Sequence, residues 1–280
     1  MARVYEARSR ANGRRVAFKV LDAAMDPVRF EREARVLASI DHPAIVRYVA
    51  HGTRDGKSWL ATEWLEGEDL ATRMEKRWLE LDEILGIARA ACGALAYLHA
   101  HGIVHRDVKP ANIFLAGPTP RVRLLDFGIA RDHSLSPLTA AHSIMGTPQY
   151  MPPEQAIDAR KADARADVFA LGAVIFEAAT LVLPEPVQRF PGVPAALHQL
   201  LARMLAPSPG DRPTAQAVHD EASRLAELFT GSDAGIEEVE VELVDISRTQ
   251  SPTQALGWMP DCIVTLAGET LGTQPRRRGP

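Results

Sequence analysis

The sequence contains few of the features that mark secreted or zinc-binding proteins. Only two cysteines occur among its 280 residues, Cys92 and Cys262. They lie far apart and belong to no CxxC or Cys/His spacing, so the pattern favours neither a disulfide framework nor a structural zinc site. A reducing, cytoplasmic compartment is therefore expected. Cys92 is expected to be a small buried hydrophobic residue rather than a reactive thiol.

A leader and a membrane span are also missing from the pattern. Residues 1–6 are charged and lack the apolar segment of a signal peptide. The longest apolar run, residues 168–183, is interrupted by Glu177 and falls short of the ~20 residues that cross a bilayer. We expect this run to form a buried helix in the core of the protein.

Neither sign of charge is in large excess. The net charge is -4 and the isoelectric point is about 6.2, which provides no basic footprint for nucleic acid or for an anionic membrane surface. With 46% hydrophobic and 24% charged residues, the composition is that of a globular protein with enough apolar side chains for a core. Neither nucleic acid nor a membrane is expected as a partner.

The periodicity of residues 1–65 predicts a small sheet with one helix. Residues 3–8 and 15–21 are short Val-containing segments around a turn at Gly13, which is typical of a β-hairpin. Asp26-Pro27 predicts the start of a helix, and His42-Pro43 predicts its end. Two further strands are expected at residues 45–50 and 58–64.

Beyond residue 65 the pattern is mostly helical. Helices are expected from residue 82 to Gly102, and at residues 163–180, 195–205 and 214–229. Residues 66–230 therefore predict an α-rich lobe, which together with residues 1–65 gives an α+β fold. Residues 231–280 are first acidic and then rich in Ser, Thr, Pro and Gly, and we interpret them as a tail.

Two short motifs offer the groups that phosphoryl transfer requires, namely a proton acceptor, cations and metal ligands. In HRDVKPAN, residues 105–112, Asp107 would face an incoming hydroxyl and Lys109 would reach the γ-phosphate. Asn112 supplies an amide oxygen for a hard cation such as Mg²⁺, and Asp126, in DFG at residues 126–128, would be the second metal ligand.

This pair of motifs resembles the catalytic and metal-binding loops of the eukaryotic-like serine/threonine protein kinases found in bacteria. Lys109, two residues after the Asp, resembles the serine/threonine branch rather than the tyrosine kinases. The resemblance covers residues 2–229 and implies a two-lobed kinase fold. It also implies ATP with Mg²⁺ or Mn²⁺, protein substrates that are phosphorylated on Ser or Thr, and a role in signalling. It specifies no oligomeric state.

Further motifs of the second lobe fit the same resemblance. GTPQYMPPEQ, residues 146–155, resembles the substrate-docking segment, in which Thr147 would contact the catalytic Asp and Lys. The resemblance also implies an ion pair between Glu154 and Arg212, and a role for Asp167 in holding the catalytic loop through backbone N–H groups. Arg106 would bind a phosphate on the activation segment. The candidate acceptors are Ser134, Ser136, Thr139 and Ser143.

In the first lobe, VAFK at residues 16–19 resembles the strand whose Lys grips the α- and β-phosphates. Glu33 would be the partner of Lys19. Taken singly, a Lys on a strand or a Glu on a helix is more often a solvated charge, but the order of the later motifs favours the kinase interpretation. The resemblance implies further ATP-binding positions in the sandwich around adenine, the back pocket and the hinge, namely Val4, Ala17, Thr62, Glu63 and Leu65.

Two parts of the family pattern are missing. The Gly-rich loop should lie immediately before Met1, so we expect either a truncation before or within that loop or a protein that works without its phosphate lid. Prolines between residues 184 and 194 replace a longer loop and helix. These departures leave open a non-catalytic nucleotide-binding or scaffold module as the alternative. A kinase of small molecules is disfavoured by Thr147-Pro148 and Glu154.

Overall fold

The computed structural model describes residues 3–10, 12–21, 27–54, 57–119, 121–126, 148–157, 162–181 and 194–230. The chain divides into two compact units, Met1–Gly231 and Ser232–Pro280. All described residues belong to the first unit. The predicted tail at residues 231–280 and the Pro-rich segment at residues 184–193 lie outside the described residues.

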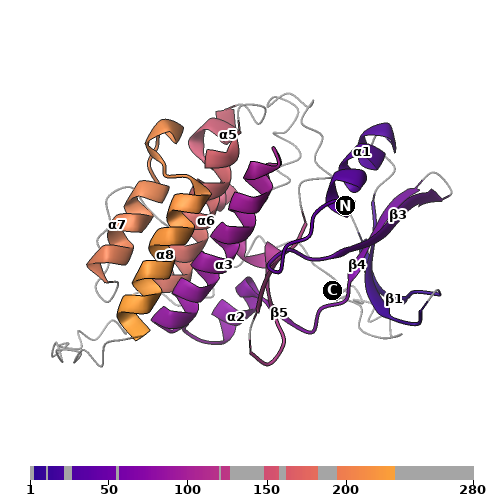
Figure 1. Cartoon of the computed structure of the whole chain (residues 1–280), viewed down its shortest axis with the longest axis horizontal. Helices are drawn as coiled ribbons and strands as arrows, with labels where there is room; N and C mark the ends of the chain where they lie inside the picture. Colours follow the sequence, from indigo (N-terminus) through magenta and orange to yellow (C-terminus); the bar gives the residue numbers. More distant parts are fainter. Residues whose placement is uncertain are drawn as a thin grey trace, which may run out of the picture. The chain divides into compact units, whose positions relative to one another are not determined.

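The first part of the unit is a four-stranded antiparallel sheet with one helix (Figure 1). The strands are β1 (Arg3–Arg8), β2 (Arg15–Val20), β3 (Tyr48–Arg54) and β4 (Lys57–Glu63), in the order β1-β2-β4-β3. Helix α1 (Pro27–Ala38) packs mainly against β3. Phe30, Ala34 and Leu37 recur at helical spacing and are buried, which explains why this segment forms a helix on the sheet. The predicted β-rich first lobe is thus present.

The predicted strand at residues 45–50 was placed too early, because β3 begins at Tyr48. Ile45 instead forms a parallel bridge with Leu124, and the Val46 N–H donates to the Leu124 carbonyl at 3.0 Å. The Leu124 N–H in turn donates to the Ala44 carbonyl at 2.8 Å. The apolar pattern at residues 44–46 therefore reflects docking onto the second lobe rather than a strand of the first. The predicted helix end at His42-Pro43 was also late, since α1 ends at Ala38.

The second lobe contains a small sheet that the helical pattern did not predict. Its strands are β5 (Gly67–Asp69), β6 (Ile113–Ala116) and β7 (Arg121–Leu124), in the order β5-β6-β7. A short helix, α2 (Leu70–Lys76), follows β5 and is capped by the Asp69 carboxylate, which accepts from the Thr72 N–H. Strands of three or four residues are too short to show an alternating period.

The remaining helices confirm the predicted α-rich lobe. They are α3 (Leu81–Ala100), α5 (Pro153–Ile157), α6 (Ala164–Thr180), α7 (Ala195–Met204) and α8 (Ala215–Thr230). Figure 1 shows α3, α6 and α8 side by side, and α3 packs against both of the others. Asp163 caps α6 by accepting from the Arg165 N–H, and Thr214 caps α8 by accepting from the Ala217 N–H.

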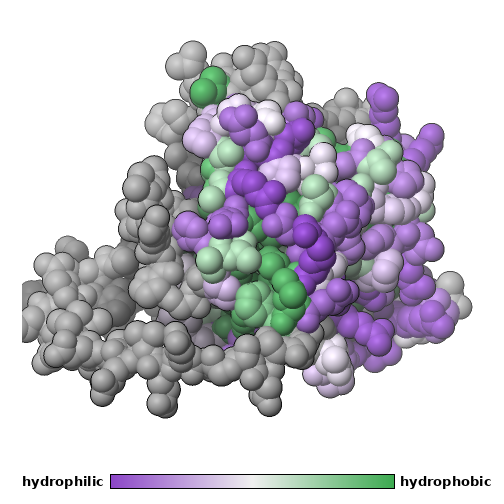
Figure 2. Space-filling model, turned by 60° about the vertical axis from the view of Figure 1, so that its left-hand side comes forward, coloured by the Kyte–Doolittle hydropathy of each residue, from purple (hydrophilic) through white to green (hydrophobic). Residues whose placement is uncertain are grey.

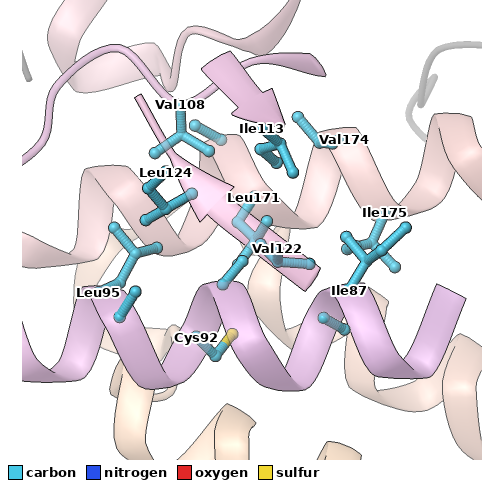
Figure 3. Close-up of a cluster of buried hydrophobic side chains, with 14 of the residues drawn as sticks. Ile87, Cys92, Leu95, Val108, Ile113, Val122, Leu124, Leu171, Val174 and Ile175 are labelled. Carbon is cyan, nitrogen blue, oxygen red and sulfur yellow. The ribbon is translucent and has the colours of Figure 1, made fainter. Parts of the chain in front are cut away.

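The core of this lobe lies between α3, α6 and the β6–β7 hairpin (Figure 3). Leu95 from α3, Leu171 from α6 and Leu124 from β7 are almost completely buried there. Cys92 is fully buried in the same cluster, and burial raises the pKa of its thiol, in accordance with the prediction of an inert residue. Val108, from the HRDVKPAN loop, also enters this core, which anchors the loop to a rigid platform.

Helix α6 explains the longest apolar run of the sequence. Its residues are buried on nearly all sides, so the run forms a core helix as predicted. Within the described residues, no helix combines the length and the apolar character that crossing a bilayer requires. Figure 2 shows hydrophilic side chains over most of the described surface in its view, with hydrophobic side chains gathered in a smaller area.

Candidate active site

The HRDVKPAN loop connects α3 to β6. Gly102 follows the end of α3 with φ at +72°, a conformation that favours glycine and turns the chain out of the helix. The loop then runs to a single 3-10 turn, η1 (Pro110–Asn112). The Leu125 N–H donates to the Asn112 carbonyl at 2.9 Å, so the end of the loop is joined to the residue before Asp126. The HRDVKPAN loop and Asp126 are therefore neighbours in space, while residues 127 and 128 of the second motif lie outside the described residues.

Asp167, in the first turn of α6, holds the HRDVKPAN loop through two backbone hydrogen bonds. Its carboxylate accepts from the His105 N–H at 2.8 Å and from the Arg106 N–H at 2.7 Å, and it is 1% exposed. Arg106 has φ at 63°, a left-handed conformation that costs a non-glycine residue roughly 1–2 kcal/mol. The two charge-assisted hydrogen bonds stabilise this backbone immediately before Asp107. His99 Nε2 lies 2.8 Å from the same carboxylate, a contact that no motif predicted.

Asp107 lies between two hydrogen-bond donors. The Asn112 side-chain amide donates to the Asp107 carbonyl at 2.7 Å and to its carboxylate at 3.0 Å. The Lys109 ammonium lies 3.2 Å from the same carboxylate oxygen. Because the Asn112 nitrogen makes both bonds, its amide oxygen is the atom that remains to bind a cation.

His105 links the two motifs from inside the core. Its Nε2 lies 2.9 Å from the Leu125 carbonyl, and its Nδ1 accepts from the Asp107 N–H at 3.3 Å. A carbonyl only accepts, so Nε2 carries the hydrogen and Nδ1 does not, which defines a neutral ring. Burial of the ring lowers the pKa of His105, although nearby carboxylates including Asp167 oppose this effect. The neutral ring thus connects the backbone at Asp107 to the residue before Asp126.

A cavity of about 240 Å³ lies between the first sheet and the segment that ends at Asp126. Its wall includes most of the predicted ATP-binding positions, namely Val4, Ala17, Lys19, Thr62, Glu63, Leu65 and Asp126. The exception is Glu33, whose side chain lies outside the described residues. No motif predicts the apolar side chains that complete the wall, among them Leu37, Tyr48, Leu60 and Phe114. Their only signal was membership of an apolar helix or strand face.

Lys19 and Asp126 meet across this cavity. The Lys19 ammonium, from β2, lies 2.6 Å from an Asp126 carboxylate oxygen. The Lys19 side chain is 19% exposed and that of Asp126 is 45% exposed. Asp126 has φ at 47°, so the chain turns sharply at this residue itself. The structure therefore places a cation and a carboxylate together at the wall of the cavity.

The segment that resembles a substrate-docking segment is anchored by Glu154 and Arg212. The expected ion pair is present, with nitrogen-to-oxygen distances of 2.6 and 2.9 Å, and the Arg212 side chain is fully buried. The guanidinium also donates to the carbonyls of Ala206, Pro207 and Arg165. Burial acts to raise the pKa of Glu154, but the hydrogen bond and charge of Arg212 outweigh it, and the pKa is lowered.

Two further contacts tie the docking segment to the catalytic loop and the core. The Gln155 side-chain amide donates to the Arg106 carbonyl at 3.4 Å. The Tyr150 hydroxyl, from the 3-10 turn η2 (Pro148–Tyr150), donates to the Glu177 carboxylate at 2.5 Å. Thr147 lies outside the described residues, as do the candidate phosphate acceptors Ser134, Ser136, Thr139 and Ser143.

The donor set of this site fits a nucleoside triphosphate with a divalent cation. The mostly apolar wall suits a planar base, and the Lys19 ammonium suits phosphate oxygens. Asn112 and Asp126 offer the oxygen ligands that hard cations prefer. No group of three His, Cys, Asp or Glu side chains within the described ranges is arranged to hold a metal ion. A cation bound here would rely on two protein ligands together with phosphate and water, which is the usual coordination of Mg²⁺ by proteins.

A two-lobed fold with a mostly apolar cavity beside Lys19 and Asp126, and with Asp107 held in a loop next to it, defines the class of phosphotransferases. Within that class, the chain belongs to the protein kinase domain family, which matches residues 1–190. The fold predicted from the sequence is confirmed by this match and by the related structures.

The relatives are bacterial serine/threonine-protein kinases. Pkn1 of Myxococcus xanthus is 37% identical over 254 residues, which cover 81% of this chain and 36% of Pkn1. PknA of Mycobacterium tuberculosis is 39% identical over 189 residues, covering 64% of this chain and 43% of PknA. The crystal structure of the Mycobacterium tuberculosis PknI kinase domain matches with a TM-score of 0.64 and 32% identity over 80% of this chain and 91% of that domain. The chain therefore spans less than half the length of Pkn1 and PknA.

Proposed function

We propose that this chain transfers the γ-phosphoryl group of ATP to Ser or Thr hydroxyls of proteins, in a signalling role. The observation that carries the proposal is the position of Asp107 in a loop held by Asp167, with Lys109 3.2 Å away. Asn112 joins this loop to the segment of Asp126. Similarity to serine/threonine-protein kinases supports the same reaction.

The nucleotide would bind in the cavity. Val4 and Ala17 would enclose the adenine, residues 63–65 would form the hinge, and Thr62 would lie at the entrance to the back pocket. Lys19 would bind the α- and β-phosphates, with Glu33 as its partner. Asn112 and Asp126 would hold Mg²⁺ or Mn²⁺, which would neutralise phosphate charge and orient the nucleotide.

Asp107 would accept the proton of the attacking hydroxyl. Its carboxylate is oriented by the Asn112 amide, and Lys109 lies where a cation can offset the charge of the transferring group. The bond that forms joins the substrate oxygen to the γ-phosphorus, and the bond that breaks releases ADP. This assignment gives Asp107 the role of base and Lys109 the role of charge stabiliser.

Residues of the second lobe would dock the protein substrate and bind a regulatory phosphate. Glu154, held by Arg212, would support the segment on which a protein substrate lies, and Thr147 would contact Asp107 and Lys109. Arg106 would bind a phosphate on Ser134, Ser136, Thr139 or Ser143. Residues 1–65 and 66–230 would be the two lobes and residues 231–280 a tail. The scarcity of cysteines, only two that lie far apart in the sequence, supports a cytoplasmic location.

Transfer of labelled γ-phosphate from ATP to a generic protein substrate tests the proposal. With Mg²⁺ we expect phosphoserine or phosphothreonine as product, and loss of the signal on chelation of the metal or in Asp107→Asn. Label no higher than in Asp107→Asn would contradict the proposal. If ATP still stabilised such an inactive protein against heat, the result would favour the non-catalytic nucleotide-binding module instead.

A further inference from the structure

A chain of hydrogen bonds connects the back of the cavity to α1. The Tyr48 hydroxyl lies 2.5 Å from His51 Nδ1, and both residues are on β3. His51 Nε2 lies 3.0 Å from the Glu31 carboxylate of α1. The relay Glu31–His51–Tyr48 therefore runs from α1, along β3, to a side chain of the cavity wall.

The chemistry of the three groups fixes the direction of these bonds. The pKa of Glu31 is lowered, because hydrogen bonds from Arg35 and His51 outweigh desolvation, so the carboxylate is charged and only accepts. His51 Nε2 must then carry the hydrogen. In the neutral ring Nδ1 is the acceptor, and the Tyr48 hydroxyl donates to it. Among the described residues, the His51 ring is in contact with Glu31, Tyr48 and the Phe30 ring, which lies in a T-shaped arrangement with it, and the His51 side chain is only 14% exposed.

Each end of the relay reaches a part of the candidate active site. Tyr48 lines the cavity and is the cross-strand partner of Thr62, the residue expected at the back pocket. Glu31 lies on α1, which contributes Leu37 to the cavity wall and carries Glu33, the proposed partner of Lys19. A shift of α1 would therefore alter both the cavity and the reach of Glu33.

Apolar packing defines which face of α1 meets the sheet, and a directional contact is needed to define its rotation more finely. Phe30, Ala34 and Leu37 bury one face of the helix, but hydrophobic contact is not directional. A hydrogen bond from a ring to a carboxylate is directional and charge-assisted. The Glu31–His51 bond would therefore restrain the rotation of α1 about its own axis.

We propose that His51 is a positioning residue, which sets the rotation of α1 against the back wall of the nucleotide cavity through the Glu31–His51–Tyr48 relay. The claim rests on the proposed function only in identifying the cavity ligand as ATP. It assigns His51 no contact with the nucleotide. Its effect on transfer would come through the placement of α1 and Tyr48.

Three variants test whether His51 acts through its hydrogen bonds to Glu31 and Tyr48 or only through the packing of its ring. His51→Phe keeps a ring against Phe30 and removes both hydrogen bonds. His51→Gln keeps an amide that can donate to Glu31 and accept from Tyr48. The matched control is Arg35→Gln, which removes the other partner of Glu31, an arginine with a 74% exposed side chain, and leaves the relay intact.

Hydrogen–deuterium exchange of the α1 amides and kcat/KM for ATP are the two measurements. In His51→Phe we expect several-fold faster exchange in α1 and about a tenfold lower kcat/KM, the effect of one charge-assisted hydrogen bond. His51→Gln should recover part of both, and Arg35→Gln should behave as the wild type. Adding Tyr48→Phe to His51→Phe should cause little further loss, because the relay is already broken.

The tautomer gives an independent readout. The ¹⁵N shifts of the His51 ring should show hydrogen on Nε2 and not on Nδ1. A ring with hydrogen on Nδ1 alone would overturn the proposal, as would α1 exchange in His51→Phe equal to that in Arg35→Gln. A wild-type chain that transfers no phosphate would contradict the proposed function, while exchange and tautomer would still decide the relay.

Discussion

Arg212 and Glu154 form a two-point ion pair inside the helical lobe, with nitrogen-to-oxygen distances of 2.6 and 2.9 Å. The pair joins α5 to the turn before α8, across 58 positions of sequence. The guanidinium also lies over the Phe169 ring at 4.8 Å, and the Arg212 side chain is fully buried. A cation buried in this way is stable only with its carboxylate in place.

Removal of either partner should therefore be costly. We expect Arg212→Met and Glu154→Gln each to lower the free energy of unfolding by about 3–5 kcal/mol, measured by urea denaturation. The control is Arg203→Gln, which breaks an ion pair with Glu221 whose partners are 50% and 25% exposed. That change should cost no more than about 1 kcal/mol. Equal losses for the two pairs would show that the buried pair is not a structural anchor.

Loss of Asp167 should disturb the HRDVKPAN loop, and therefore kcat, more than it disturbs the binding of ATP. Asp167→Ala leaves the His105 and Arg106 N–H groups without their acceptor, at a cost on the order of 1–3 kcal/mol for each. Because Arg106 is in a left-handed conformation, the loop should relax and carry Asp107 away from its position. We expect kcat to fall while the dissociation constant for ATP changes little. A variant with unchanged kcat and a weaker affinity would contradict this role.

The buried ring of His105 predicts a dependence of stability on pH. Burial lowers the pKa of His105 in the folded protein below the ordinary value of 6.5. As the pH falls, the unfolded chain therefore takes up the proton before the folded protein does. The contribution of the neutral ring to the free energy of unfolding is complete above pH 6.5 and declines as the pH falls toward the lowered pKa. His105→Gln, which does not titrate, should flatten this slope in urea denaturation at several pH values. The pKa of His42 is also lowered by burial, so His42→Gln is the comparison that measures its share.

Loss of Lys19 should weaken the binding of the ATP phosphates and not that of the adenine base. Its ammonium lies at the cavity wall beside Asp126, so we expect it to contact the phosphates and not the adenine. Lys19→Met should weaken ATP binding by about tenfold or more, the loss of a charge-assisted hydrogen bond, and leave adenosine binding unchanged in calorimetry. Lys57→Met, at an exposed position of β4, is the control. An equal loss for adenosine would instead indicate collapse of the cavity.

Motif-bearing residues were the predictable part of the site. Asp107, Asn112 and Asp126 were identified from short motifs, because phosphoryl transfer requires those side chains at fixed spacing. The pairing of Glu154 with Arg212 was likewise expected from the family pattern and is present in the structure. The long helices α3, α6 and α8 were predicted to within a few residues for a different reason, because burial of one face of a helix imposes a period on its apolar residues.

The features of the fold and the site that the sequence did not predict depend on contacts between distant segments. Ile45 resembled part of a strand of the first sheet, but it is buried by docking against Leu124. The strands of the β5-β6-β7 sheet are too short to have a recognisable period. His51 lies on an edge strand, where a polar residue is usually a solvated one, and its partner Glu31 is 20 positions away. No local pattern indicates such a pair, because the folding of α1 onto β3 creates it.

The most direct test of the account is a comparison of Asp107→Asn with the wild type in binding and in a single turnover. The substitution keeps the shape of the side chain and removes the proton acceptor. We expect an ATP dissociation constant within a few-fold of the wild type and a rate of phosphoryl transfer lower by about 10²–10⁴-fold. An unchanged single-turnover rate in Asp107→Asn would contradict the central claim that this loop performs the transfer.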